Sequence, residues 1–509
     1  MSKFLVFTIV VIFVGAGIIP STVGIKKEKT TITTTDSPGY IQDLIDNASN
    51  GDTIYIPSGI YYENIVIDKS ISLIGEDKYT TIIDGSNIGD VIYVSADWVN
   101  ISGFTIQNSQ IYYDHAGIHL DSNYNKIEGN ILTSNRGSGI FLDSNNNIIT
   151  ENEILNNEEF GISLYGDNNL ITRNIIFYNN YAGISLTSYN STITKNIIYF
   201  NNIYVDYYRA GIYLVWCGYC KIIDNILNEN GITLYESSTN IVDNNTISNC
   251  DCGLGLDVCW GPFCNNIFSN NSFFNSGVKI GLGEEGLYEN NTFSDNTVNE
   301  KPFVYLENES DKVIDVDAGQ ICLINCDNIT VQNQDLSNTI IGIFLGGTDN
   351  SSILNNTISS NMEAGIFFWD SSNNNIFGNN ISSNNLGIYI CYSNGNTIYH
   401  NNLLFNTKNA DDDGENTWDD GKYGNYWSDY EEKYPDAKPK LFKPWMWNTP
   451  YEISGGDNKD NCPLLKQWPS LKFRDLPRNR STFQSLIFRF LEQFPRLEIF
   501  LNYMREVMK

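Results

Sequence analysis

The chain has 509 residues, of which 60 are acidic and 31 are basic, for a formal net charge of -29. Nucleic acids and anionic membranes are bound through positive protein surfaces, so this charge argues against both as partners of the chain as a whole. The ten cysteines form an even set, which is consistent with structural disulfides or buried thiols in an exported protein.

The N-terminal segment, residues 1–24, has the pattern of a secretory signal peptide. A lysine is followed by an apolar run from Phe4 to about Ile19 and then by small residues. The run is also nearly long enough to stay as an N-terminal anchor, so both interpretations remain open. Either one predicts a secreted or cell-surface protein.

A short helix is expected next. Ser37 is a suitable N-cap, Pro38 suits the first helical position, and Ile41 and Ile45 share one face with Tyr40 and Leu44. This apolar face can cover the exposed strand edges of the element that follows it.

An internal repeat dominates the chain from Gly117 onwards. Segments of the type "GISL" begin at Gly117, Gly139, Gly161 and Gly183, each 22 residues after the last. Each is followed by two more short apolar stretches that Asn, Ser and Gly separate, as in "NLIT" and "NIIF". A period this short, with alternating β-type segments, predicts a right-handed parallel β-helix with three strands in each coil of about 22 residues.

Stacking of such coils makes two further predictions. Ile118, Ile140, Ile162 and Ile184 should form an apolar column inside the helix, because equivalent residues of adjacent coils lie above one another. Asparagines that recur with the same period should form ladders of side-chain hydrogen bonds. We place the β-helix at residues 33–407, with an excursion from it at about 299–317, after which the period resumes at Gly319.

Beyond the last coil the chain becomes irregular and then helical. Residues 408–466 are predicted to form an aromatic and acidic C-terminal cap, in which Trp418, Tyr426, Trp427 and Tyr430 close the last coil with help from Trp445 and Trp447. Residues 470–509 show helical spacing of apolar residues and predict an amphipathic helical tail, which docks on the β-helix, contacts a protein partner or lies on a membrane.

Three segments in a fixed order resemble one family. They are "GDTIYIPSGIYYENIVIDKSISLIGE", the junction "KPFVY…DAGQICLINCDNITVQN" and the ending "GNYWSDY…TPYEISGGDNKDNCPLL". Together with the coils they resemble the NosD-type β-helix proteins, a family called periplasmic copper-binding proteins and abundant in exported archaeal forms. The resemblance covers roughly residues 33–466, and it implies export and an envelope role more securely than chemistry.

The sequence contains candidate ligands for calcium but little that is typical of a copper site. Relatives follow "GNYWSDY" with an aspartate- and glycine-rich segment, which this chain replaces with "EEKYPDAKPKLFKPWMWNTPYEI". The remaining calcium candidates are Asp411, Asp412 and Asp413, although their spacing is not that of a helix-loop-helix calcium loop. Copper delivery is a third functional alternative, which the sequence disfavours because it has no methionine- or histidine-rich tract.

The residues that alternate with the inward Ile and Leu are predicted to form an exposed face. Aromatic rings on such a surface can stack on sugars, so our leading hypothesis is a non-catalytic binding or scaffold protein that recognises a glycan. The alternative is that these residues only stabilise exposed strands. The candidate ligand-binding residues are Phe141, Tyr165, Tyr213, Tyr235, Phe367, Trp369 and Tyr389.

A catalytic alternative centres on the start of this face. Asp121 and Asp143 fall in register one coil apart, close to His119 and with Arg136 on a neighbouring turn. Paired carboxylates at such a separation suit a polysaccharide hydrolase, or a lyase that also uses an arginine. The stacking of repeats brings like residues together in any case, so the pair alone does not establish an enzyme.

The sequence also contains acceptor patterns for N-glycosylation, which an exported chain would carry on surface turns. They occur at Asn47, Asn100, Asn190, Asn244, Asn270, Asn290, Asn308, Asn328, Asn350, Asn355 and Asn380, and in the tail at Asn479.

Overall fold

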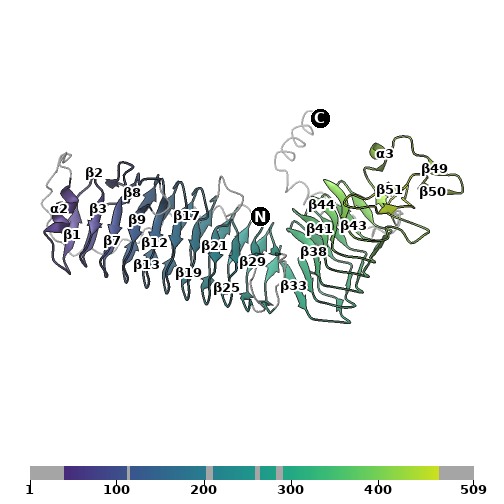
Figure 1. The fold of residues 1–509 in the computed structure, drawn as a ribbon, viewed down its shortest axis with the longest axis horizontal. Coiled ribbons are helices and arrows are strands. Elements are labelled where there is room, and N and C mark those ends of the chain that lie inside the picture. The colour runs from purple at the N-terminus through teal and green to yellow at the C-terminus, as the bar shows by residue number, and fades with distance from the viewer. Residues whose placement is uncertain (1–38, 112–114, 202–209, 258–263, 282–289, 469–509) are drawn as a thin grey trace, which may run out of the picture.

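The computed structural model describes residues 39–111, 115–201, 210–257, 264–281 and 290–468. They form a right-handed parallel β-helix, as predicted, whose coils lie in two rows that meet at β33 (Lys301–Glu307) (Figure 1). The predicted signal or anchor at 1–24, the Ser37 cap and the tail at 470–509 lie outside the described residues.

The first coil stack, residues 53–298, has three parallel sheets, and each coil adds one strand to each of them, except that the last coil, with β31 and β32, adds none to sheet C.

Sheet A consists of β1 (Thr53–Ile56), β4 (Ser72–Gly75), β7 (Asn100–Ser102), β10 (Lys126–Glu128), β13 (Ile148–Thr150), β16 (Leu170–Thr172), β19 (Thr192–Thr194), β22 (Lys221–Ile223), β25 (Ile241–Asp243), β28 (Ile267–Ser269) and β31 (Thr292–Ser294). Sheet B consists of β2 (Gly59–Tyr62), β5 (Thr81–Asp84), β8 (Thr105–Gln107), β11 (Ile131–Thr133), β14 (Glu153–Leu155), β17 (Ile175–Phe177), β20 (Ile197–Tyr199), β23 (Ile226–Asn228), β26 (Thr246–Ser248), β29 (Ser272–Phe274) and β32 (Thr297–Val298). Sheet C consists of β3 (Ile65–Ile67), β6 (Ile92–Val94), β9 (Ala116–Leu120), β12 (Ser138–Leu142), β15 (Ile162–Leu164), β18 (Ile184–Leu186), β21 (Ile212–Val215), β24 (Ile232–Tyr235), β27 (Leu254–Asp257) and β30 (Val278–Ile280).

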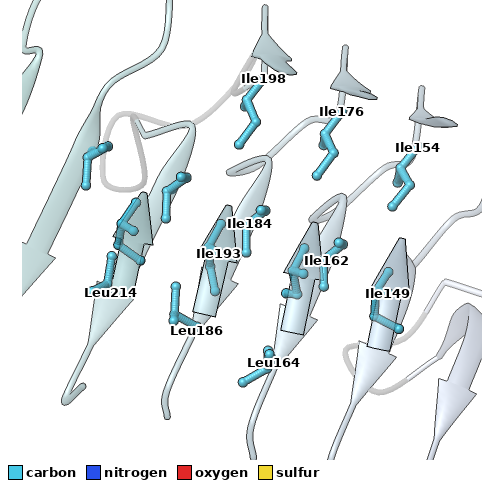
Figure 2. Packing of buried hydrophobic residues seen from close by; sticks show 14 of the residues in the cluster. Ile149, Ile154, Ile162, Leu164, Ile176, Ile184, Leu186, Ile193, Ile198 and Leu214 are labelled. Atoms are coloured by element: carbon cyan, nitrogen blue, oxygen red, sulfur yellow. The ribbon is translucent and has the colours of Figure 1, made fainter. Parts of the chain in front are cut away.

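The predicted apolar column is present in sheet C. Ile118, Ile140, Ile162 and Ile184 are fully buried and pair in register from one coil to the next. Sheets A and B contribute equivalent columns, so the interior is a continuous stack of Ile and Leu side chains (Figure 2). Burial of one such side chain stabilises a fold by about 1.5–3 kcal/mol, which explains why the period tolerates so little variation at these positions.

The predicted asparagine ladders are also present, and they are buried. The backbone N–H and Nδ2 of Asn152 both donate to Oδ1 of Asn174, at 3.0 and 3.1 Å, and Asn174 repeats this contact with Asn196. Nδ2 of Asn174 also donates to the carbonyl of Ile149 at 3.0 Å. The amide therefore satisfies the polar backbone where each coil turns from sheet A to sheet B.

The N-terminal end of the stack is covered by α2 (Tyr40–Asp46), with Ile41 and Ile45 fully buried. Its N-cap residue is Gly39, in a left-handed conformation and without a side-chain cap. The Glu63 carboxylate, from the first coil, instead accepts hydrogen bonds from the backbone N–H groups of Ile41 and Gln42. A carboxylate there satisfies two free donors and complements the helix dipole.

The segment 299–317 does not leave the β-helix, so the predicted excursion is wrong. Asn299 and Glu300, with φ of 51° and 68°, form a tight turn after β32, and β33 then pairs antiparallel with β32. β33 also pairs in parallel with β35 (Gln320–Ile324), and β34 (Val313–Ile314) pairs with β36 (Thr330–Gln332). The segment is therefore the first coil of a second stack.

This second coil stack, residues 301–427, also has three sheets. Sheet X consists of β33, β35, β38 (Ile341–Gly346), β41 (Ala364–Trp369), β44 (Leu386–Cys391) and β47 (Lys408–Asp412). Sheet Y consists of β34, β36, β39 (Ser352–Leu354), β42 (Asn375–Phe377) and β45 (Thr397–Tyr399). Sheet Z consists of β37 (Asp335–Ser337), β40 (Thr357–Ser359), β43 (Asn380–Ser382), β46 (Asn402–Leu404) and β48 (Tyr426–Trp427).

The strand reversal moves the core to the other face of a shared sheet. Val298 lies opposite Lys301, so Phe303 and Tyr305 share its face, and both pack with the first core. Val304 and Leu306 point the other way and pack with the second core. Sheet X thus continues sheet B but encloses its own interior on the opposite side.

The C-terminal end of the second core is covered by aromatic residues. Trp418, Trp427 and Tyr430 are buried, and Trp427 stacks on Tyr451 at 3.9 Å. Trp445, in contrast, is 44% exposed. This region contains α3 (Tyr430–Lys433) and the strands β49 (Pro439–Lys440), β50 (Lys443–Trp447), β51 (Tyr451–Glu452) and β52 (Lys459–Asp460).

Within the described ranges, no helix has the length and apolar character needed to span a membrane.

Candidate functional site

The outer surface of sheet C carries an aromatic row at its first coils. Tyr93, His119 and Phe141 pair in register on β6, β9 and β12. Their rings meet edge to face, with centroids 5.1 Å apart for Tyr93 and His119 and 4.9 Å apart for His119 and Phe141. The register of the coils therefore builds a continuous aromatic strip with an imidazole at its centre.

Asp90 joins two of the three histidines of the chain. Its Oδ2 lies 3.1 Å from Nδ1 of His119, and its Oδ1 lies 3.5 Å from Nδ1 of His115. Oδ1 also accepts a hydrogen bond of 2.7 Å from the backbone N–H of Ala116. A carboxylate held in this way fixes the orientation of the His119 ring, because the hydrogen bond at Nδ1 determines the role of the other nitrogen.

Tyr93 is linked to the predicted carboxylate Asp121. Its hydroxyl donates a 2.7 Å hydrogen bond to Oδ2 of Asp121. This bond, together with burial, raises the pKa of Tyr93. The phenol therefore keeps its proton at neutral pH and acts as a donor.

The predicted carboxylate pair is in register, whereas the predicted arginine lies apart from it. Leu120 pairs with Leu142, so Asp121 and Asp143 follow at equivalent positions of adjacent coils, and both are exposed. Arg136 instead lies 3.8 Å from Glu158 in the next coil. The structure thus brings His119 and Asp121 together through Tyr93 and leaves Arg136 in a separate ion pair.

A stacked aromatic pair lies at the corner between sheets C and A, directly beside these residues. The rings of Trp98 and Tyr124 are 4.6 Å apart and nearly parallel, at 7°, and the residues are 66% and 46% exposed. The corner is tied together by the bond from Trp98 N–H to the carbonyl of Asn123 and by the bond from Asn123 N–H to Asp97. Trp98 and Tyr124 have φ of 65° and 60°, a conformation that bulky residues rarely adopt.

The predicted ligand-binding aromatics are less exposed than expected. Phe141, Tyr213 and Phe367 are buried, at 8%, 9% and 4% exposure, so the prediction that they present open ring faces is wrong. Phe141 packs between His119 and Tyr165, and Phe367 packs between Phe344 and Tyr389, while Tyr213 belongs to a small apolar cluster with Phe160, Ala182 and Ala210. The remaining candidates, Tyr165, Tyr235, Trp369 and Tyr389, are half-buried.

The predicted calcium ligands point in different directions. Asp412 is buried and accepts hydrogen bonds from the Trp418 indole and the Asn416 side chain. Asp411 pairs with Lys408, and Asp413 accepts from the backbone N–H of Tyr392. Successive residues of β47 alternate in direction, which separates Asp411 from Asp412. In the part of the chain that the structure describes, no three His, Cys, Asp or Glu residues are placed to hold a metal ion.

The cysteines are packed as free thiols where the structure describes them, and Cys259 lies outside those ranges. Cys217 and Cys220 lie in the first core and donate hydrogen bonds to the carbonyls of Leu186 and Ser188. Burial raises the pKa of the Cys250 thiol to about 12. A thiol that is difficult to deprotonate is a poor ligand for a soft metal, so Cys250 gives copper delivery no support.

The acceptor asparagines mostly lie on the surface. Nine of the eleven described ones are exposed, whereas Asn100 and Asn380 are half-buried in β7 and β43.

Sequence reasoning missed Asp90, Tyr93, Trp98 and Tyr124. The first three precede the regular repeat, since Tyr93 pairs with His119 across 26 residues rather than 22. These residues could have been found by aligning "VIYVSAD" (residues 91–97) with "GIHLDSN" (residues 117–123). This alignment places Tyr93 above His119 and Trp98 one coil before Tyr124.

Comparison with protein families gives two matches. A family described as "Periplasmic copper-binding protein (NosD)" matches residues 199–315 and 265–432. A family described as "Right handed beta helix region" matches residues 90–232. No curated protein matches the chain.

Solved structures similar to this chain include polysaccharide-modifying enzymes. An alginate lyase from Paenibacillus sp. strain FPU-7 is 16% identical, with a TM-score of 0.41, and the alignment covers 51% of this chain and 95% of the lyase. For the pectate lyase Pel9A the values are 15% identity, a TM-score of 0.40 and coverage of 50% and 73%. The A-module of the mannuronan C-5 epimerase AlgE4 from Azotobacter vinelandii is 14% identical, with a TM-score of 0.28 and coverage of 76% and 93%. Likeness at this level concerns the fold alone.

Proposed function

We propose, from the premise that this chain is a NosD-type right-handed β-helix repeat protein, that it is an extracytoplasmic, non-catalytic protein that recognises a glycan. The binding surface is the corner formed by Trp98 and Tyr124 together with the adjacent Tyr93 and Asp121.

The observation that carries this proposal is the exposed Trp98–Tyr124 stack in a left-handed backbone conformation. The next three corners hold Asn146, Asn168 and Asn190 at the same position, with φ of 59° in each. Asparagine adopts this conformation readily, whereas a tryptophan or tyrosine there costs about 1–2 kcal/mol. Two adjacent corners thus carry bulky exposed rings where the fold favours asparagine, and such strain is characteristic of functional positions.

The surrounding groups suit a hydroxyl-rich sugar. A flat aromatic surface accepts the apolar face of a pyranose ring, and a carboxylate accepts more than one hydrogen bond, so Asp121 retains capacity beyond its bond to Tyr93. Asp97 and Asp143 are also exposed close by. With these carboxylates and a net charge of -29, a neutral glycan is favoured over an acidic one.

A glycan array probed with the full chain tests the proposal, followed by affinity measurements with Trp98→Asn. Asparagine preserves the backbone conformation and removes the ring, so affinity should fall about tenfold with no loss of stability. Trp216→Asn is the matched control, because Trp216 is also an exposed tryptophan at a corner, with φ of 53°, in a distant coil. An array without binding, or equal losses in both variants, would contradict the proposal.

A second candidate function, a polysaccharide-active enzyme, is favoured by the arrangement of Asp90, His119 and Tyr93. His119, oriented by Asp90, would remove a ring proton next to a carboxyl group. The electron pair would form a carbon–carbon double bond as the glycosidic C–O bond breaks, and Tyr93 would protonate the departing oxygen.

This second candidate is tested by the absorbance of unsaturated sugar products and by reducing-end release. Turnover that His119→Gln and Tyr93→Phe abolish, with Trp216→Asn unaffected, would establish an enzyme in place of a non-catalytic binding protein.

A further inference from the structure

The most exposed large apolar side chains among the described residues lie together at the tip of one hairpin. Leu441 and Phe442, which connect β49 to β50, are 85% and 88% exposed. The hairpin lies at the extreme C-terminal end of the coil rows and extends away from them (Figure 1). Two adjacent apolar side chains held in water at a protruding tip indicate a contact that the chain itself does not make.

The base of this hairpin is firmly fixed. Met446 is fully buried, and the ring of Trp447 stacks on Tyr430 with centroids 4.9 Å apart. Trp447 N–H donates to the carbonyl of Pro463 at 2.9 Å, and Leu465 N–H donates to the carbonyl of Trp445 at 3.0 Å. The tip is therefore presented by a rigid element.

The charge of the hairpin itself is opposite to that of the chain. The segment 438–447, "KPKLFKPWMW", contains three lysines and no acidic residue, in a chain with a net charge of -29. Lys440 and Lys443 pair with each other directly below the tip, and Lys438 is exposed on the same hairpin. At about 0.15 M salt, charges are screened beyond about 8 Å, so the acidic coils contribute little to the potential at this tip.

We propose that the 438–447 hairpin inserts Leu441 and Phe442 into the surface of an anionic lipid bilayer. An apolar tip enters the acyl boundary, a collar of lysines meets the anionic headgroups, and a half-exposed tryptophan, here Trp445, suits the interface between them. This proposal departs from the expectation drawn from the overall charge, because the hairpin itself carries three lysines and no acidic residue.

Cosedimentation of the full chain with vesicles tests this proposal. Binding is expected to vesicles containing phosphatidylglycerol, to weaken with salt, and to be much weaker to pure phosphatidylcholine. Leu441→Asp with Phe442→Asp should reduce partitioning by about 30-fold or more, and Lys440→Glu with Lys443→Glu by about tenfold. Phe405→Asn is the matched control, because Phe405 is 78% exposed at a turn of the second coil stack, and it should bind like the unmodified chain.

Vesicle binding that survives in the Leu441→Asp, Phe442→Asp variant would overturn the proposal and assign any membrane contact to another part of the chain. The absence of vesicle binding would overturn it as well. A change in sedimentation mass in the tip variant, without vesicle binding, would assign the hairpin to a contact between copies of this chain instead.

Discussion

Asparagine performs two separate tasks in this molecule, and its position within the coil decides which. Asn152, Asn174 and Asn196 are buried and bridge adjacent coils through their side-chain amides. Asn146, Asn168 and Asn190 instead adopt the left-handed conformation at exposed or partly exposed corners. The first group is required for its hydrogen bonds and the second for its backbone, so the two should respond differently to substitution.

Asn174→Ala should lower the free energy of unfolding by about 3 kcal/mol, because it leaves buried partners such as the Ile149 carbonyl and the Asn152 N–H unsatisfied. Asn168→Gly is the control, since glycine preserves the positive φ and the side chain is exposed, and it should change stability by less than about 1 kcal/mol. Chemical denaturation of both variants gives the comparison. Equal effects would show that the buried ladder contributes no more than a surface corner does.

At the scale of the element, the turn between β32 and β33 determines where the second core forms. Its two residues, Asn299 and Glu300, both have positive φ, and the Asn299 side chain donates to the carbonyls of Ser337 and Asn338. Tight turns with two positive φ values match the natural twist of a hairpin and favour Asn followed by Gly. Glu300 is therefore the strained member of the pair.

Glu300→Gly should raise the free energy of unfolding by about 0.5–1 kcal/mol, because glycine removes the conformational strain at φ of 68°. Glu300→Val should lower it, since a β-branched residue is the least tolerant of this conformation. Thermal unfolding of the two variants beside the unmodified chain checks the ordering. Destabilisation by glycine would mean that the Glu300 side chain makes a contribution larger than its backbone strain.

The element scale also shows where sequence reasoning succeeds. Ile118 and Asn174 were predictable because each repeats every 22 residues, and stacking converts that period directly into contacts. The reversal at Asn299 was not predictable in this way, because "GI-L" segments occur in both stacks. They form sheet C in the first stack but sheet X, the continuation of sheet B, in the second.

In the candidate site, too, the features that the 22-residue period determines were predictable and the others were not. The register of Asp121 with Asp143 is a consequence of the period and was predicted. The contacts of Asp90 and the stack of Trp98 on Tyr124 lie in coils whose lengths depart from the period, so the spacing gave no guide to them. The burial of Phe141 and Phe367 depends on the size of their neighbours in adjacent coils, which the alternation of inward and outward positions does not describe.

At the scale of the whole molecule, one long acidic solenoid presents two different contact surfaces far apart. The corner at Trp98 and Tyr124 lies in the early coils, and the basic hairpin lies beyond the last coil (Figure 1). With both proposed contacts formed, the hairpin would hold the C-terminal end at a lipid surface while the early coils remain free to bind a glycan. Each contact is made by residues that depart from what the repeat itself requires.

The most direct test of glycan recognition is amide hydrogen exchange of the full chain with and without the best-binding oligosaccharide. We expect slower exchange in peptides that cover residues 91–98 and 119–126, and unchanged exchange in those that cover 212–235, where Tyr213 is buried in its own cluster. Protection confined to the later coils, or no protection near Trp98 and Tyr124 at a saturating concentration, would contradict glycan binding at this corner.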